Sequence, residues 1–222
     1  MAIVVCPVFC CKAKEMKNYS IIRDGEYKKL KTLTIDGEIL DLGGNFNSEY
    51  HNLISGNHKF TSVNINPEYG CDMVFDIQET FPIESGKFDT VICMNVLEHV
   101  YKFNNVVSET SRVLKEGGQF IFAVPFMHHI HGSPDDYFRY SRSAIEKMLI
   151  ENNFQVISIN EIGLGLFSLF YQSSSGMFPN IFKVIFKNVA ISLDKVLLAL
   201  SKRYRNVAKR IPLGYFVIAK KN

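Results

Sequence analysis

The sequence lacks the features of a membrane-spanning, secreted or repetitive protein. It contains no run of about 18 uninterrupted apolar residues, so it predicts no membrane-spanning helix. Residues 2–11 are apolar, but they lack a basic leading region and a small-residue cleavage site, which argues against a signal peptide. There is no internal repeat and no low-complexity tract. With 222 residues, of which 47% are hydrophobic, we expect residues 1–222 to form a single globular domain.

The cysteines lack any repeated spacing. They are five in number, and no second pair and no histidine follows at the distance of a zinc ribbon. We therefore expect free thiols, a reducing compartment and a cytoplasmic protein. The cysteines are Cys6, Cys10, Cys11, Cys71 and Cys93.

The C-terminal part of the chain is almost without acids. From Ile162 to the end there are ten basic residues and one acid, Asp194, so this part carries about +9 and the remainder about −6. Such a balance indicates either an anionic partner, such as phosphate or a membrane surface, or helices with a solvated basic face. We expect residues 163–210 to be an apolar and basic helical insertion. It would cap a site, pack on the core, form a homodimer face or lie peripherally on a membrane.

Strand and helix signals alternate along the chain. Such alternation predicts an α/β fold, a Rossmann-like, doubly wound, mostly parallel seven-stranded sheet with helices on both faces. Helical spacing of apolar residues over 106–114, with Gly117-Gly118 as the stop, and a capping box of Ser143 and Glu146 predict two helices. The seven expected strands are Glu38–Leu42, Phe60–Ile65, Met73–Phe75, Asp89–Met94, Gln119–Val124, Phe154–Ile159 and Gly214–Ala219.

Five short motifs occur in an order and spacing that resemble class I S-adenosylmethionine (SAM)-dependent methyltransferases. The resemblance is nearest to the small type-11 group often associated with cell-surface polysaccharide synthesis. It covers residues 39–154 and 212–220, and it implies a last strand antiparallel to the others. The motifs are Ile39-Leu-Asp-Leu-Gly-Gly44, Val63-Asn-Ile-Asn-Pro67, Cys71-Asp-Met-Val-Phe-Asp-Ile77, Phe88-Asp-Thr-Val-Ile-Cys-Met-Asn-Val-Leu-Glu-His-Val100 and Ser111-Arg-Val-Leu-Lys-Glu-Gly-Gly118.

The resemblance implies a set of cofactor-binding residues at the carboxyl ends of the strands. Glycines after the first strand let the backbone approach the amino-acid end of SAM, and the N-terminus of a following helix would favour its carboxylate. An acceptor at the end of the second strand would hold the ribose, and Asp76 with the N–H of Ile77 would hold the adenine. The full set is Asp41, Gly43, Gly44, Asn45, Asn64, Asp76, Ile77 and Asn95.

Two of these positions depart from the family pattern. Asn45 stands where a second glycine is usual, and Asn64 where an acid usually accepts both ribose hydroxyls. Asparagine tolerates left-handed backbone geometry, so the turn can form, but its side chain would crowd the cofactor. The amide of Asn64 lacks the charge that strengthens such a hydrogen bond. Both changes predict weak SAM binding, and they favour the alternative of a domain that has lost catalysis.

Residues 126–140 follow the fifth strand and are expected to form a lid at the active edge. The segment resembles the His-x-x-Pro-x-Asp-Tyr-x-Arg-Tyr pattern of that type-11 group. We predict His131 as a general base oriented by Asp136, with Tyr137 and Arg139 binding the acceptor. A structural lid with Asp136 paired to Arg139 is the alternative. The matching residues are His131, Pro134, Asp136, Tyr137, Arg139 and Tyr140.

The sequence predicts no metal site at the histidines of this segment or at Glu98-His99. His128, His129 and His131 lack compact ligand spacing, so we predict no metal site. Glu98-His99 opens the stretch after the fourth strand, either as a helix cap or in a catalytic role.

The sequence therefore predicts an enzyme that transfers a methyl group from SAM to an oxygen of a sugar or glycan-linked acceptor. The alternatives are a non-catalytic binding or scaffold module on a methyltransferase fold, and a methyltransferase for a quinone or other lipid. We expect a small-molecule or glycan acceptor and no nucleic acid. The expected location is the cytoplasm, either free or peripheral to a membrane.

Overall fold

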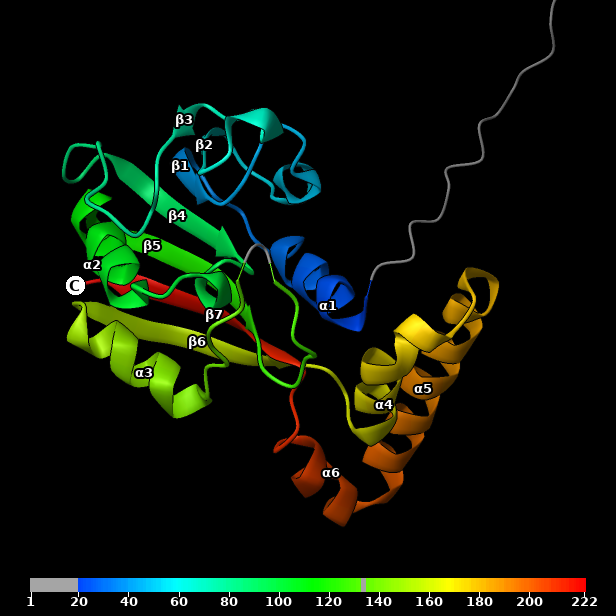
Figure 1. Cartoon of the computed structure of the whole chain (residues 1–222). Coiled ribbons are helices and arrows are strands. Elements are labelled where there is room, and N and C mark those ends of the chain that lie inside the picture. The colour runs from blue at the N-terminus through cyan, green and yellow to red at the C-terminus, as the bar shows by residue number, and fades with distance from the viewer. Residues whose placement is uncertain (1–19, 133–134) are drawn as a thin grey trace, which may run out of the picture.

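A computed structural model describes residues 20–132 and 135–222 and contains one seven-stranded sheet (Figure 1). The strand order is β3-β2-β1-β4-β5-β7-β6. Strand β7 runs antiparallel to both of its neighbours, and the pairs among β1 to β5 are parallel. The predicted fold class is therefore confirmed. The strands are β1 (Gly37–Leu42), β2 (His58–Asn64), β3 (Met73–Val74), β4 (Phe88–Met94), β5 (Leu114–Pro125), β6 (Phe154–Ile162) and β7 (Gly214–Lys221).

Helices cover both faces of the sheet. One face packs on α2 and α3 through a core that includes Leu40 and Phe122, and the other packs on α1 through Ile39 and Ile121. Neighbouring residues of one strand thus enter opposite cores, as the pleat requires. Figure 1 shows α2 and α3 on one side and α1 on the other. The helices are α1 (Ile21–Leu30), α2 (Phe103–Val113), α3 (Arg142–Glu151), α4 (Leu166–Ser174), α5 (Asn180–Leu200) and α6 (Lys202–Ala208).

The connection from β1 to β2 differs from the prediction. Turns and the short 3-10 helix η1 (Glu49–Leu53) follow Gly44, and the described residues of this connection contain no α-helix. Asn45 Oδ1 accepts from the N–H of Asn47 at 2.8 Å, and the N–H of Asn45 donates to Ser48 Oγ at 3.0 Å. Such local bonds compete with helix formation. The prediction of a helix after Gly44, whose N-terminus would bind the carboxylate of the cofactor, was therefore wrong.

Two predicted helix boundaries were also wrong. Helix α2 ends at Val113, and Leu114 already pairs with Phe88 as the first residue of β5. The cap of α3 is Ser141, whose Oγ accepts from the N–H of Ala144 at 3.3 Å, so Ser143 lies inside the helix. The Ser143–Glu146 capping box therefore does not form. Cys6, Cys10, Cys11 and Pro134 lie outside the described residues.

Residues 163–210 contain α4, α5 and α6, which stand off the sheet, with α4 and α5 next to α1 (Figure 1). Ile21 and Ile22 of α1 share a small core with Tyr171 of α4 and Ala190 of α5. The acid of this part, Asp194, is buried and accepts from two backbone N–H groups at the start of α4. A search of the described helices for one long and apolar enough to cross a membrane finds none.

Candidate active site

A cleft of about 610 Å³ opens at the carboxyl ends of the parallel strands. Ligands of open α/β sheets bind at this edge, and the volume lies within the range of small-molecule sites. Residues from the ends of β1, β2, β3 and β4 converge on it. Five of the eight predicted cofactor-binding residues line the cleft, namely Gly43, Asn64, Asp76, Ile77 and Asn95.

The glycine turn after β1 consists of Gly43 and Gly44. Asp41 and Gly44 do not line the cleft. The buried carboxylate of Asp41 accepts from Tyr50 Oη at 2.7 and 2.8 Å and lies 2.6 Å from His51 Nε2. A Cβ on residue 44 would overlap this carboxylate. Gly44 is therefore needed because Asp41 fills the space beneath it. The two residues support the turn from inside the protein.

The left-handed position of this turn belongs to Gly43, whose φ is +82°. A side chain there would also meet Val96, which lines the cleft. Asn45 does not have positive φ, so the left-handed tolerance expected of it is not used. Its amide oxygen is held in the local turn with Asn47 and does not line the cleft.

Asn64 holds the glycine turn as well as lining the cleft. Its Nδ2 donates to the carbonyl oxygens of Gly43 and Gly44, each at 3.3 Å, and its Oδ1 accepts from the N–H of Asn66 at 3.1 Å. The amide thus uses donors that an acid would not have. This structural duty gives a physical reason for asparagine at the end of β2.

Asp76 is arranged to offer one free carboxylate oxygen. Its Oδ1 accepts from the N–H of Gln78 at 2.9 Å, and no described residue donates to Oδ2. Ile77, next in the chain, is buried at the wall of the cleft. An acceptor beside a backbone N–H is a suitable pair for a purine edge.

Asn95 ends β4 in a left-handed conformation, with φ of 55°. Its Nδ2 donates to Glu26 Oε1 of α1 at 2.9 Å. Burial raises the pKa of Glu26, and the hydrogen bond from Asn95 opposes this shift. A non-glycine residue with this φ is uncommon and often marks a functional position.

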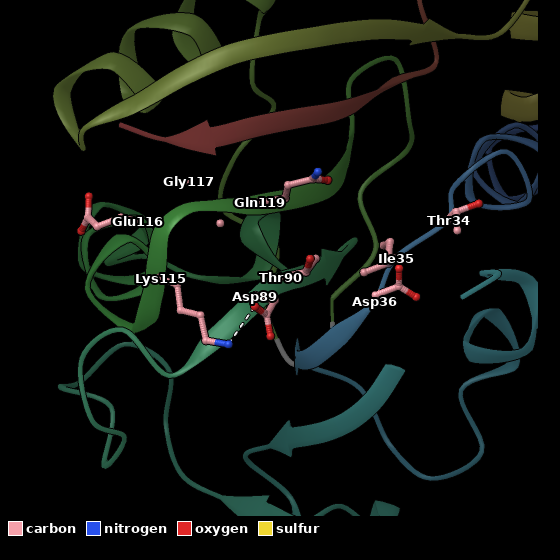
Figure 2. A pocket seen from close by; sticks show the side chains of 10 residues that line it. Thr34, Ile35, Asp36, Asp89, Thr90, Lys115, Glu116, Gly117 and Gln119 are labelled. Atoms are coloured by element: carbon pink, nitrogen blue, oxygen red, sulfur yellow. Dashed lines mark hydrogen bonds and ion pairs between the residues drawn. The ribbon is translucent and has the colours of Figure 1, made fainter. Parts of the chain in front are cut away.

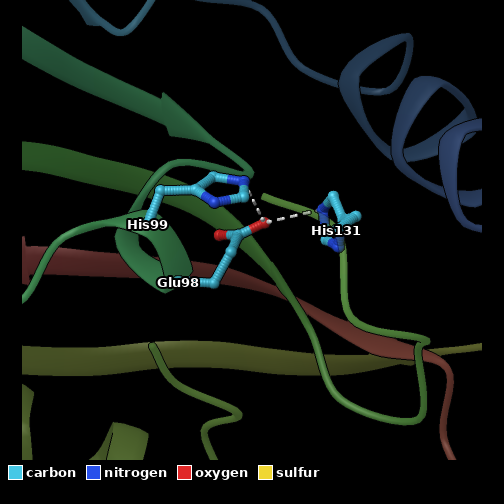
Figure 3. Close-up of side chains that lie close together, drawn as sticks. All are labelled: Glu98, His99 and His131. Carbon is cyan, nitrogen blue, oxygen red and sulfur yellow. Dashed lines mark ion pairs between the residues drawn. The ribbon is translucent and has the colours of Figure 1, made fainter. Parts of the chain in front are cut away.

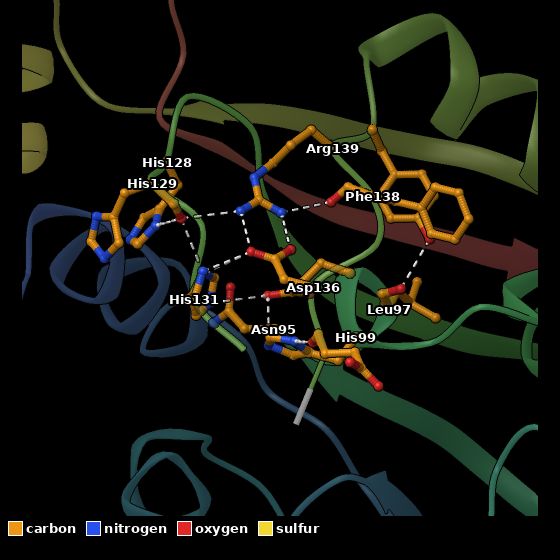
Figure 4. A network of polar contacts seen from close by, with 12 residues as sticks. Asn95, Leu97, His99, His128, His129, His131, Asp136, Phe138 and Arg139 are labelled. Atoms are coloured by element: carbon orange, nitrogen blue, oxygen red, sulfur yellow. Dashed lines mark hydrogen bonds and ion pairs between the residues drawn. The ribbon is translucent and has the colours of Figure 1, made fainter. Parts of the chain in front are cut away.

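In the predicted lid, Asp136 and Arg139 form a bidentate ion pair, with Oδ2 2.6 Å from Nη2 (Figure 4). The side chain of Asp136 is almost fully buried, and its hydrogen bond with Arg139 holds its pKa well below its usual range. Asp136 Oδ2 also accepts from the backbone N–H of His131 at 2.8 Å. The carboxylate therefore positions the segment around His131, and the catalytic roles of both residues stay predictions.

Tyr137 lines the cleft, and its hydroxyl donates to Asp135 at 2.9 Å. Arg139 does not line the cleft, because its guanidinium is committed to Asp136 and to the carbonyls of His129 and Phe138. Of the two predicted acceptor-binding residues, the structure thus places Tyr137 alone at the cleft wall.

Glu98 and His99 lie next to His131 (Figure 3). His99 lines the cleft together with Asp135 and Tyr137. Glu98 Oε1 lies 3.7 Å from His99 Nε2 and 4.0 Å from His131 Nε2. Burial raises the pKa of Glu98 to about 8, and burial also lowers the pKa of His131. Glu98 does not cap a helix and instead lies under the two imidazoles. Its buried position was the feature that the sequence could not reveal.

A second hollow, of about 270 Å³, lies at the opposite edge of the sheet (Figure 2). Lys115 Nζ lies 2.7 Å from Asp89 Oδ1 at its wall. The hollow adjoins the amino ends of β1 and β4, away from the edge where open α/β sheets bind ligands, and none of the predicted site residues lines it. It has no part in the candidate site.

Comparison with known families matches residues 43–122 to the family described as a methyltransferase domain. This part of the chain, a little over a third of it, is thus similar to a methyltransferase domain. The match begins at the glycine turn and ends in β5, so it takes in every residue named above at the cofactor end of the cleft.

Other proteins are similar to this chain in sequence or in fold. An uncharacterized protein of Methanocaldococcus jannaschii is 29% identical over 107 residues, which are 46% of this chain and 40% of that relative. The match thus spans less than half of the relative's length. A SAM-dependent methyltransferase structure from Mesorhizobium loti has a TM-score of 0.57 at 13% identity, covering 89% of this chain and 99% of that one. The [4+2]-cyclase SpnF also has a TM-score of 0.57, at 14% identity, covering 88% and 79%. At these identities, the likeness shows a shared fold.

Proposed function

We propose that this protein transfers the methyl group of SAM to an oxygen of a sugar or glycan-linked acceptor. The observation that carries the proposal is the convergence of Gly43, Asn64, Asp76 and Asn95 on one cleft at the carboxyl edge of the sheet. The match of the methyltransferase domain to the same residues supports it.

The cofactor supplies the sulfonium leaving group, so the protein's contribution is mainly positioning. The backbone at Gly43 would approach the amino-acid end, and Asn64 would face the ribose. Asp76 Oδ2 would accept from the adenine amine, with the N–H of Ile77 beside it. Asn95, three positions before Glu98 in the chain, would then lie near the methyl group.

A hydroxyl acceptor must lose its proton as the methyl group arrives. Burial lowers the pKa of His131, so its imidazole is neutral at neutral pH and has a lone pair to offer. The general-base role predicted for His131 requires that lone pair, on Nε2, to be free. Asp135 and Tyr137 add a carboxylate and a hydroxyl to the lining of the cleft, which suits a glycan acceptor. The choice of a sugar rests on the resemblance to the polysaccharide-associated group.

A non-catalytic binding module is the second candidate. It is favoured by the amide of Asn64, whose donors and acceptor are already engaged within the protein. The likeness to SpnF, a cyclase, shows that this fold also occurs in a protein named for another reaction.

Transfer of radiolabelled methyl from SAM to a panel of soluble glycans and glycolipids tests the proposal. We expect label in at least one hydroxyl-bearing acceptor, and loss of transfer in Asp76→Ala. Glu79→Gln is the matched control, because Glu79 lies on the same loop, is exposed and does not line the cleft. Binding of cofactor without transfer to any member of the panel would favour the binding module.

We further propose that the outer face of α5 lies on an anionic membrane surface, where a lipid-linked acceptor would be found. This face carries a stripe of exposed apolar side chains at helical spacing, from Ile181, which is 77% exposed, to Leu200, which is 79% exposed. Exposed basic residues surround its C-terminal end. The apolar stripe consists of Ile181, Phe182, Ile185, Phe186, Val189, Leu193, Val196 and Leu200.

Charge favours lipid over a second copy of the chain on this face. Residues 166–210 contain one acid, Asp194, and it is buried. A twofold dimer would place the same surface against itself, so basic residues would face basic residues with no acid to pair with them. Anionic headgroups would instead neutralise them.

Co-sedimentation with vesicles tests this surface. We expect binding to phosphatidylglycerol vesicles, weaker binding to phosphatidylcholine vesicles, and about tenfold weaker binding in Ile185→Glu. Ile150→Glu is the matched control, because Ile150 is an isoleucine on α3 that is at least as exposed as Ile185. The proposal would be contradicted if the wild-type chain did not bind vesicles but formed a dimer, and if Ile185→Glu were monomeric.

A further inference from the structure

Three side chains that approach each other at the mouth of the cleft form a compact cluster of ligand atoms. Glu98 and His99 come from the short helix η3 (Leu97–His99) after β4, and His131 comes from the segment after β5 (Figure 3). One ligand atom from each lies within 4.8 Å of the others. We call these residues the Glu98–His99–His131 cluster.

The carboxylate of Glu98 is buried without a partner. Its side chain is inaccessible to solvent, and neither of its oxygens has a hydrogen-bond partner among the described residues. Figure 3 shows the carboxylate directed between the two imidazoles. A buried polar group without a hydrogen bond is uncommon in proteins and calls for a ligand or another explanation.

His99 is held with a lone pair facing this carboxylate. Its Nδ1 lies 2.6 Å from the carbonyl oxygen of Asp135, which can only accept. In the neutral imidazole, Nδ1 therefore carries the hydrogen and Nε2 carries the lone pair. Nε2 is the atom that lies 3.7 Å from Glu98 Oε1.

His131 is held in the same way. Its Nδ1 lies 3.3 Å from the carbonyl oxygen of His129 and 3.5 Å from Asp136 Oδ2, and both oxygens are acceptors. Asp136 is kept ionised by Arg139 (Figure 4). The Nε2 lone pair of His131 thus faces Glu98 as well. Metal-binding histidines in proteins typically donate their other N–H to a carbonyl or carboxylate in this manner.

We propose that the Glu98–His99–His131 cluster binds a divalent first-row transition ion such as Zn²⁺ through Oε1 and the two Nε2 atoms. Two imidazoles and one carboxylate suit such ions, whereas Mg²⁺ and Ca²⁺ prefer oxygen ligands. Ligand atoms of a tetrahedral zinc site stand roughly 3.4 Å apart, as follows from bonds of about 2.1 Å. Glu98 Oε1 lies 3.7 and 4.0 Å from the two Nε2 atoms, and all three ligand atoms lie within 4.8 Å of one another, so binding requires a contraction of up to about 1.4 Å.

The ion would adjoin the cleft, because His99 is one of its lining residues. Three protein ligands would hold the ion, and the ion would lower the pKa of an acceptor hydroxyl group that approaches it. A part in methyl transfer rests on the proposed function. In that case, the ion would activate the hydroxyl in place of His131, since Nε2 of His131 cannot both bind a metal and accept a proton.

Metal titration of the full chain, freed of metal by chelator and dialysis, tests the site without cofactor or acceptor. We expect Co²⁺ to give visible absorption bands and Zn²⁺ to give a one-to-one calorimetric isotherm. Glu98→Gln, His99→Gln and His131→Gln should each weaken Zn²⁺ binding at least tenfold. The control is His129→Gln, because His129 is an exposed neighbour outside the cluster. The Zn²⁺ affinity of His129→Gln should stay within twofold of that of the wild type.

Two results would overturn the proposal. One is a wild-type chain that shows no Co²⁺ bands and no Zn²⁺ heat. The other is binding that survives Glu98→Gln but is lost in His129→Gln, which would place the ion on the exposed histidines. His131→Gln keeps the test valid if Glu98→Gln fails to fold, because His131 is partly exposed. Titration of the metal-free chain with the demethylated product of SAM shows separately whether the proposed function fails.

Discussion

The side chain of Asn64 joins the cofactor end of the cleft to the glycine turn. Its two amide donors hold the carbonyls of Gly43 and Gly44, so the residue that looks like a lost acid also stabilises the turn. Replacing it with aspartate would add charge and remove these two donors. The cofactor affinity and the stability of the free protein should therefore change in opposite directions.

For Asn64→Asp we expect tighter binding of S-adenosylhomocysteine (SAH), the demethylated product of SAM. The gain should be on the order of 1 kcal/mol, about fivefold in Kd, because the carboxylate gives charge-assisted bonds to the ribose. The melting temperature without ligand should fall. Calorimetry and thermal unfolding measure the two effects. Asn47→Asp adds the same charge to an exposed position of the neighbouring loop, and unchanged values there are expected. Weaker binding in Asn64→Asp would mean that the ribose lies elsewhere.

Glu98 should make the stability of the protein depend on pH in the neutral range. Its pKa is raised from 4.5 to about 8, so the folded state holds a proton that the unfolded state releases above about pH 4.5. Stability from this group is present at low pH and is lost as the pH rises toward 8. The loss is at most about 1.4 kcal/mol per pH unit.

Glu98→Gln should remove this dependence, so its advantage over the wild type should grow between pH 5 and pH 8. Urea unfolding in the presence of chelator, at several pH values, measures it. Glu109→Gln is the control of opposite sign, since the hydrogen bond from Arg112 lowers the pKa of Glu109, which is also largely buried. That variant should lose stability at neutral pH. Parallel pH profiles for Glu98→Gln and the wild type would contradict the burial argument.

At the scale of elements, the segment between β5 and α3 is held by one ion pair. Arg139 bridges Asp136 to the carbonyls of Phe138 and His129, so the pair fixes the backbone on both sides of the acid. Loss of the carboxylate would leave a half-buried guanidinium without its charged partner. The loss should therefore loosen the segment between β5 and α3 and leave the sheet unchanged.

Asp136→Asn should cost about 2 kcal/mol of unfolding free energy, because breaking a largely buried pair leaves an uncompensated charge. SAH affinity should change little, since the cofactor residues belong to other loops. Asp135→Asn is the control. Asp135 is exposed, and among the described residues its side chain bonds only Tyr137, so the effect should stay within about 0.5 kcal/mol. A drop in SAH affinity equal to the drop in stability would show that the segment also shapes the cofactor site.

At the scale of the whole molecule, the sequence predicts the sheet better than the connections. Apolar runs such as Phe120–Val124 mark buried strands because both faces of the sheet are covered. The absence of a helix after Gly44 could not be predicted, because it depends on hydrogen bonds that Asn45 makes with Ser48 and Asn47 in the turn. The boundary at Leu114 was missed because β5 begins without an intervening loop.

The candidate site shows the same division. Gly43, Asn64, Asp76 and Asn95 follow strand ends, so the topology alone brings them together. The inward position of Asp41 and the burial of Glu98 depend on side-chain packing, which the sequence does not show. His99 meets His131 across 32 positions of the chain, a contact that only the fold reveals.

Calorimetric titration of the full chain with SAH tests whether this cleft binds the cofactor. We expect one-to-one binding and a rise in melting temperature with ligand concentration. Asp76→Ala should bind about tenfold more weakly, because it removes the carboxylate acceptor for the adenine amine, and Glu79→Gln should bind like the wild type. A wild-type chain that gives no heat and no thermal shift at millimolar SAH would contradict a cofactor site in this cleft.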